Sequence, residues 1–321
     1  MRWIKRSIVV YLAVLFVLLL PFQAFAAKAE KLIPMGHSIG IHMNLKGVFV
    51  INDVLLDDEK WLKAGDVFKQ IDSKPIKTMT DFDDVITNLP EDRKVILSVK
   101  RGNQTVDLES SKKDLQNFYP FVRDRTEGIG TLTYIDPEKG EYGALGHQII
   151  DAALKSPPSF STGSIYLATI EQIKKSVPGN PGYKISSILK EDHPLGDIQS
   201  NEIYGIFGDW QSSTLTGAFP EPLEIMREDE VKPGKATIYT TIEGETVEQF
   251  SIAITSVKGS SFQFELTDKE LISKTGGILQ GMSGSPIIQN GKFAGVITHM
   301  FVEDPLKGAA LPMTKMLKKQ P

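Results

Sequence analysis

Residues 281–286, near the carboxyl end of the chain, have the types and spacing that nucleophilic catalysis needs, because they read Gly-Met-Ser-Gly-Ser-Pro. A serine hydroxyl attacks a carbonyl only when a base removes its proton and preorganised donors hold the developing oxyanion. The flanking glycines, Gly281 and Gly284, permit a tight turn that exposes the oxygen of Ser283. In such a turn the amides of Gly281 and Ser283 would point the same way and form an oxyanion hole. The stretch predicts Ser283 as a nucleophile, and a glycine-rich turn without chemistry is the alternative.

The segment after Ser283 supports a catalytic interpretation. Residues 287–299 read as a strand, a turn and a second strand. A hairpin in this place resembles the one that follows Gly-x-Ser-Gly-Gly-Pro in chymotrypsin-like barrels. The resemblance favours a serine peptidase.

A base is then required, and the sequence favours His147 for that role. The chain contains five histidines, which are His37, His42, His147, His193 and His299. The first two lie far from the nucleophile in another unit, His193 lies in a polar loop-like stretch, and His299 suits a structural or specificity-pocket role. His147 follows the small residues of 143–146, which allow close packing around an imidazole. With an ordinary pKa of about 6.5, a histidine takes a serine proton near neutral pH. A buried, hydrogen-bonded histidine is the alternative.

A third group, an acid, would fix the tautomer of the imidazole. Spacing alone leaves six candidates open, which are Asp151, Asp192, Asp197, Asp209, Asp229 and Asp268. Asp151 lies close to His147 in the chain, too close to reach the far ring nitrogen easily. Asp268 comes shortly before Ser283.

The elements that must position these side chains read as short strands. From Gly128 onward glycine and proline repeatedly interrupt apolar stretches, as at 129–135, 237–242 and 250–254. Short apolar stretches separated by glycine and proline over roughly 200 residues predict a β-barrel or β-sandwich architecture.

An earlier unit, residues 33–112, has a different pattern. We expect strands at its start, a helix capped by Thr80 with Asp83 that ends before Pro90, and a hairpin that turns at Gly102-Asn103. This order resembles a PDZ domain, a fold that binds an extended peptide beside a strand. The resemblance predicts that the amides of Ser38, Ile39, Gly40 and Ile41 face the carboxyl terminus of a bound peptide. A β unit that serves only as a spacer is the alternative.

Composition places the chain among globular proteins and excludes several activities. It has 321 residues, of which 41% are apolar and 24% charged, enough for two or three domains. The net charge of −4 provides no basic field, so we expect no nucleic-acid partner. The absence of cysteine excludes disulfides, cysteine nucleophiles and thiolate metal sites. The histidines lack metal-ligand spacing, and neither a metal nor another cofactor is expected.

The first 26 residues have the pattern of an export signal. Arg2, Lys5 and Arg6 precede an apolar run over 8–22, and 24–26 read Ala-Phe-Ala. The run has about 15 residues, whereas a span needs about 20. We expect a cleaved signal peptide or, alternatively, an uncleaved membrane anchor, and in both cases a protein that works outside the membrane.

Several motifs together resemble the stage IV sporulation protein B peptidase family of endospore-forming bacteria. The motifs are 128–133, 143–147, 267–269, 275–286, 298–299 and 304–305. The family places a PDZ unit before the peptidase, whereas HtrA-type proteases place it after. The resemblance implies a mainly β chain in which a PDZ domain (33–112) precedes a chymotrypsin-like double β-barrel (113–321).

The resemblance also implies a catalytic triad of His147, Asp268 and Ser283 and a role in sporulation. Members of the family are exported from the forespore, process their own chain, and cleave the membrane-held stage IV sporulation protein FA. This cleavage releases an intramembrane protease that activates a late sigma factor, while the PDZ unit holds target or self peptides.

Two stretches depart from the family pattern. Tyr183 stands where an acidic residue is expected, and 309–313 lacks the expected glycine and aromatic residues. The departures lie outside the triad, so they bear on substrate preference more than on hydrolysis, and a divergent paralogue with a different target is one alternative. A second alternative, from a different class, is a non-catalytic protein that binds peptides through the PDZ groove and keeps a relic barrel.

Overall fold

The computed structural model describes residues 30–57, 59–91, 93–188, 193–211, 215 and 219–318. The predicted signal or anchor, residues 1–26, lies outside the described residues. Within these ranges no helix has the length and apolar character of a membrane span.

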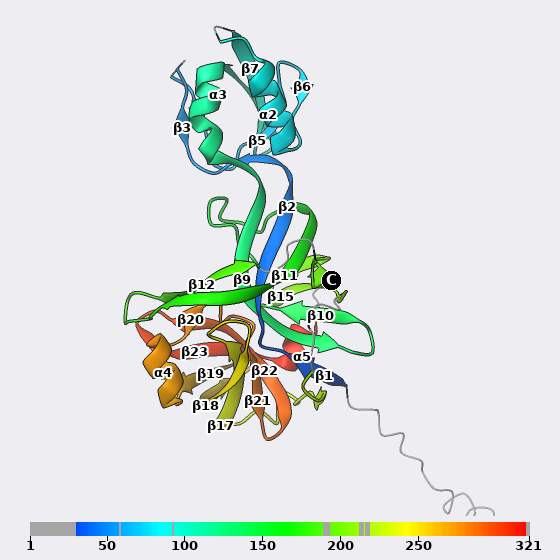
Figure 1. The fold of residues 1–321 in the computed structure, drawn as a ribbon, viewed down its shortest axis with the longest axis vertical. Coiled ribbons are helices and arrows are strands. Elements are labelled where there is room, and N and C mark those ends of the chain that lie inside the picture. The colour runs from blue at the N-terminus through cyan, green and yellow to red at the C-terminus, as the bar shows by residue number, and fades with distance from the viewer. Residues whose placement is uncertain are drawn as a thin grey trace, which may run out of the picture. The chain divides into compact units, whose positions relative to one another are not determined.

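A fifteen-stranded sheet occupies the first two thirds of the fold, and β2 (Ser38–Val50) lies at its centre. β2 pairs antiparallel with β9 (Val122–Asp136) on one side and with β11 (Phe160–Lys174) on the other (Figure 1). The strands that extend or flank this centre are β1 (Lys31–Pro34), β10 (Glu141–Ala144), β12 (Gly182–Ile188), β13 (Gly196–Asp197), β14 (Ser200–Glu202), β15 (Gly205–Asp209), β16 (Leu223–Glu224) and β20 (Leu279–Gln280).

The carboxyl-terminal part forms a closed six-stranded barrel (Figure 1). Its strands are β17 (Gly234–Thr241), β18 (Val247–Lys258), β19 (Ser261–Leu266), β21 (Pro286–Gln289), β22 (Lys292–Phe301) and β23 (Asp304–Pro312), with helices α4 (Lys269–Thr275) and α5 (Met313–Met316) beside them. The pairing of β17 with β21 closes the barrel. Alternation along the strands fills its interior, since Phe250, Ile252 and Ile254 of β18 all belong to one buried core. The predicted mainly β architecture is confirmed. Among the described strands only these six close into a barrel, and the first of the two expected barrels is part of the larger sheet.

Residues 47–121, called the small unit below, have a core of their own that starts at Val48. They contain β3 (Val54–Leu55), β4 (Trp61–Leu62), β5 (Val67–Ile71), β6 (Lys74–Pro75), α2 (Met79–Asn88), β7 (Lys94–Arg101), β8 (Gln104–Ser111), α3 (Lys112–Phe118) and the short 3-10 helix η1 (Tyr119–Phe121). The rings of Phe68, Phe82 and Phe118 lie 5.3–6.0 Å apart at the centre. The expected β7–β8 hairpin is present, and Gly102 turns it with a φ of 58°.

The helix cap lies two residues before the predicted one. Thr78, in extended backbone, accepts a hydrogen bond from the amide of Asp81, whose carboxylate accepts from Thr78 in return. Thr78 and Thr80 are each followed by an aspartate three residues later, so the sequence offers two equivalent capping boxes. A further bond decides between them, because Asp124 of β9 accepts from the amide of Met79 at 2.8 Å.

The predicted peptide groove at Ser38, Ile39, Gly40 and Ile41 is wrong. These four residues are the buried start of β2. Ser38 pairs with β9, and the other three pair with both β9 and β11, so their backbone groups belong to the sheet and do not face a peptide. Gly40 is needed for close packing, because a Cβ there would lie 2.4 Å from Cγ1 of Ile188. The side chains of 39–43 contribute to the core around β9 and β10, so the separate core of the small unit begins later than residue 33.

Candidate active site

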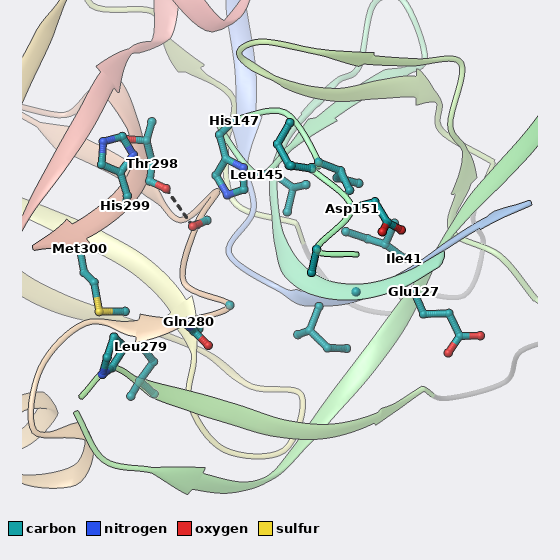
Figure 2. A pocket seen from close by; sticks show the side chains of 18 of the residues that line it. Ile41, Glu127, Leu145, His147, Asp151, Leu279, Gln280, Thr298, His299 and Met300 are labelled. Carbon is teal, nitrogen blue, oxygen red and sulfur yellow. Dashed lines mark hydrogen bonds between the residues drawn. The ribbon is translucent and has the colours of Figure 1, made fainter. Parts of the chain in front are cut away.

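His147 and Ser283 line one cleft of about 660 Å³. His147 comes from the loop after β10, and Ser283 from the turn between β20 and β21. Figure 2 shows His147 facing the same space as Thr298 and His299, which belong to β22. The Ser283 hydroxyl donates to the carbonyl of Thr298 at 2.9 Å, the dashed bond in Figure 2. The two residues predicted as nucleophile and base therefore meet in one cleft, although they are remote in sequence.

The turn that carries Ser283 requires its glycines. Gly281 and Gly284 have φ values of 95° and 99°, a region that side chains disfavour. A Cβ at Gly284 would also lie 2.2 Å from the carbonyl oxygen of Thr131. These conformations confirm the tight, exposing turn that was expected.

The backbone of this turn leaves the amide of Ser283 for an oxyanion. The amides of Met282, Gly284 and Ser285 donate to backbone carbonyls at 2.8–3.1 Å. That of Ser283 donates to no backbone carbonyl of the described residues. The amides of Ser283 and Gly281 are the two that the sequence predicts for the oxyanion hole, and both residues line the cleft.

The imidazole of His147 is held in the tautomer that a general base needs. Its Nδ1 lies 2.9 Å from the carbonyl oxygen of Gln148. Because a carbonyl only accepts, this bond requires the proton on Nδ1 and leaves Nε2 as the acceptor. Leu145 and Gly146 turn the loop with φ values of 74° and 71°, and a positive φ at a leucine is strained backbone of the kind found at functional sites.

The electrostatic surroundings of His147 favour its neutral form. Burial lowers the pKa of His147 most strongly, the hydrogen bond to Gln148 raises it, and the charge of His299 lowers it again. The net effect is a lowered pKa. At neutral pH the ring is therefore uncharged and able to accept a proton.

The structure does not join the predicted acid to the imidazole. Asp268 caps helix α4, where Oδ1 accepts from the amides of Glu270 and Leu271, both at 3.1 Å, and Oδ2 accepts from Ser251 at 3.3 Å. It makes no hydrogen bond to His147 in the described structure, and its role as the acid stays a prediction.

Asp151, the acid nearest in sequence, is also engaged elsewhere. It lines the cleft but pairs with Arg123 at 2.6 Å and accepts from two amides of its own turn, those of Ala153 and Leu154. In this conformation the carbonyl of Gln148, not a carboxylate, fixes the tautomer.

The contacts of Asp268 predict that Asp268→Asn mainly affects stability. Asparagine is a good helix cap, but its side chain has one acceptor oxygen where the aspartate has two, so one hydrogen bond is lost. We therefore expect a loss of about 1 kcal/mol in the free energy of unfolding. Hydrolysis of labelled casein should stay near the wild-type rate. Asp229→Asn, at an exposed ion pair with Arg227, is the control. A fall in kcat of about 10⁴ in a folded variant would instead assign Asp268 to the triad.

Sequence reasoning missed two buried residues next to the nucleophile turn. Thr131 of β9 hydrogen-bonds both Gly281 and Ser283. Lys184 of β12 is buried, and its Cδ would lie 3.3 Å from a Cβ at Gly281. Thr131 was part of a recognised motif, but no local signal marks either residue as a neighbour of Ser283.

Ser283 on its glycine turn and His147 line one cleft beside a closed β-barrel, an arrangement that serine peptidases use. The model of the SpoIVB peptidase S55 family matches residues 118–317, which include both side chains. The chain belongs to this family, and it is a serine peptidase that hydrolyses peptide bonds in protein substrates.

Solved structures of proteases are similar at a low level. The active form of the Rv3671c protease from M. tuberculosis has 14% identity and a TM-score of 0.37, over 60% of this chain and 73% of that one. The HtrA-type protease AlgW with a decapeptide has 11% identity and a TM-score of 0.32, over 87% of this chain and 62% of that one. A comparison with curated proteins found no significant match. The activity is therefore argued from the family and from the site itself.

Proposed function

We propose that the chain is an exported serine endopeptidase in which Ser283 is the nucleophile and His147 the general base. The observation that carries the proposal is that both side chains line one cleft, which Gly281 also lines. Together these groups supply the nucleophile, the base and the oxyanion donors that acyl transfer requires.

The reaction begins when the Ser283 hydroxyl leaves Thr298 and turns to Nε2 of His147. The exchange loses one hydrogen bond, worth about 1 kcal/mol, and gains another. As Oγ attacks the scissile carbonyl, its proton passes to Nε2, and the amides of Gly281 and Ser283 hold the oxyanion. The imidazolium then gives the proton to the leaving amine. Water hydrolyses the acyl-enzyme by the same route, with His147 again as base.

The biological role is proposed from family membership and from the amino-terminal pattern. We place the enzyme in the space between the forespore and mother-cell membranes, either released or anchored by residues 1–26. It would process its own chain and cleave stage IV sporulation protein FA, which triggers activation of a late sigma factor. Amino-terminal sequencing of the exported product tests the signal and any self-cleavage. A product that starts at residue 1 and remains intact would contradict signal removal and self-processing.

The test of the mechanism is the rate at which a fluorophosphonate probe labels Ser283, measured as a function of pH. The probe reacts only with an activated serine, and mass spectrometry identifies the modified residue. Because the pKa of His147 is lowered, the labelling rate should fall as the ring is protonated, with its midpoint below pH 6.5. His299→Gln removes a charge that lowers this pKa, so the fall should begin at higher pH.

Two outcomes would count against the mechanism. A folded chain that is not labelled at Ser283 at any pH would favour the non-catalytic binding protein. A midpoint above pH 6.5 would contradict the proposed state of His147. Unfolding must be followed in parallel, because burial also lowers the pKa of His37 to about 4. Between pH 6.5 and 4 the unfolded chain binds that proton more readily than the folded chain, so stability decreases as the pH falls.

A further inference from the structure

Thr131, a buried residue of β9, contacts both halves of the site. Its Oγ1 donates to the carbonyl of Gly281 at 2.7 Å, and its amide donates to the carbonyl of Ser283 at 3.1 Å. Its own carbonyl accepts from the amide of Leu145 at 3.2 Å, two residues before His147. We propose that Thr131 is a positioning residue that orients the amide of Ser283, one of the two proposed oxyanion donors, and holds the nucleophile turn against the histidine loop. The inference rests on the proposed function.

The two bonds from Thr131 fix the peptide groups on either side of the Met282–Ser283 peptide. In the Gly281–Met282 peptide, which precedes it, the carbonyl accepts from Thr131 Oγ1 and the amide donates to the carbonyl of Leu279. In the Ser283–Gly284 peptide, which follows it, the carbonyl accepts from the Thr131 amide and the amide donates to the carbonyl of Ile297. Because both neighbours are fixed at both ends, the peptide between them has little freedom to rotate, and its Ser283 amide stays available to an oxyanion.

The third bond connects the same residue to the base. Leu145 begins the left-handed pair of residues that precedes His147. The contact is close, since a Cβ at Gly284 would lie 2.2 Å from the Thr131 carbonyl oxygen and 2.7 Å from the Leu145 amide. A shift of Thr131 would therefore displace nucleophile and base relative to each other.

The side-chain hydroxyl is the part of this arrangement that a substitution can remove. Thr131→Val keeps the shape and the backbone bonds but leaves the Gly281 carbonyl without its donor. Thr131→Ser keeps the donor. The chain also offers a matched control, because Thr133 on the same strand is equally buried and its Oγ1 has no hydrogen-bond partner in the part of the chain that the structure describes. Thr133→Val removes a hydroxyl of the same kind that holds nothing.

The experiment compares these three variants with the wild-type chain in hydrolysis of labelled casein, with thermal unfolding measured for each. For Thr131→Val we expect kcat to fall about 10- to 100-fold with KM within twofold, the range for loss of one oriented donor next to an oxyanion site. Thr131→Ser should restore kcat to within about threefold of wild type, and Thr133→Val should leave it within twofold.

The outcomes separate this inference from the proposed function. The positioning role would be overturned if the wild type is active and Thr131→Val keeps kcat within twofold of it. A change in KM alone would overturn the role as well. So would a failure of serine to restore the rate. A wild type that neither hydrolyses casein nor labels at Ser283 would reject the proposed function. Should valine prevent folding, Thr131→Cys, a weak donor of similar size, gives the same comparison with serine.

Discussion

Ser283→Ala is expected to lower the rate of peptide hydrolysis by about a million-fold while the chain still folds. The substitution removes the only atom of the cleft that we assign to attack the carbonyl. It also removes one hydrogen bond, to the Thr298 carbonyl, which is worth about 1 kcal/mol and leaves the buried turn intact. Hydrolysis of labelled casein and the appearance of self-cleavage products measure the loss, and circular dichroism shows that the fold remains.

Ser285 provides the matched control for this experiment. It lies in the same motif, is fully buried, and its Oγ has no hydrogen-bond partner among the described residues. Ser285→Ala should therefore leave hydrolysis within about twofold of wild type. Retained proteolysis in Ser283→Ala, or an equal loss in both variants, would reject Ser283 as the nucleophile.

Lys184→Met is expected to stabilise the protein by several kcal/mol at pH 7. The Lys184 ammonium is buried and, among the described residues, donates hydrogen bonds to two hydroxyls, those of Ser38 at 3.1 Å and Thr240 at 3.4 Å. Burial lowers its pKa to about 7. Methionine keeps the apolar stem against Gly281 and removes the ammonium, at the loss of two hydrogen bonds.

The pH dependence of unfolding gives the sign of this effect. Between pH 7 and the ordinary lysine value of about 10.4, the unfolded chain binds the proton while the folded chain has released it. Stability that depends on Lys184 therefore rises with pH, by about 2–3 kcal/mol from pH 7 to 9. The difference between wild type and Lys184→Met should shrink by that amount, whereas Lys174→Met, at the protein surface, should show no such trend. A constant difference, or a less stable Lys184→Met, would refute the prediction.

The sequence was sufficient to predict those parts of the site that depend on residues close together in the chain. Glycines at 281 and 284 predict the nucleophile turn, and two apolar runs separated by Asn290-Gly291 predict the β21–β22 hairpin, because tight turns impose short-range rules. The small residues before His147 likewise mark a close approach, and a Cβ at Gly146 would lie 3.1 Å from the Ile297 carbonyl oxygen.

The sequence was insufficient where partners are remote. The Ser-Ile-Gly-Ile segment at 38–41 has the composition of a binding loop, but the strands on its two sides, β9 and β11, make it the centre of a sheet. The Thr131–Gly281 bond joins positions 150 residues apart, and the Lys184–Ser38 bond joins positions 146 apart. Such long-range contacts form only when the chain folds, and a single sequence does not reveal which residues will make them.

The central strand β2 has a consequence for how the molecule can be divided. One end of β2 contributes Val48 and Val50 to the core of the small unit, and the other contributes Ile39, Ile41 and Met43 to the core beside the active site. The small unit and the part that holds the active site therefore share one strand and are not separate domains joined by a linker. A chain that began after residue 112 would retain the whole segment matched by the family model, residues 118–317. It would lack β2, so the edges of β9 and β11 that pair with β2 would be exposed. Exposed strand edges of this kind pair with strands of other chains and promote aggregation.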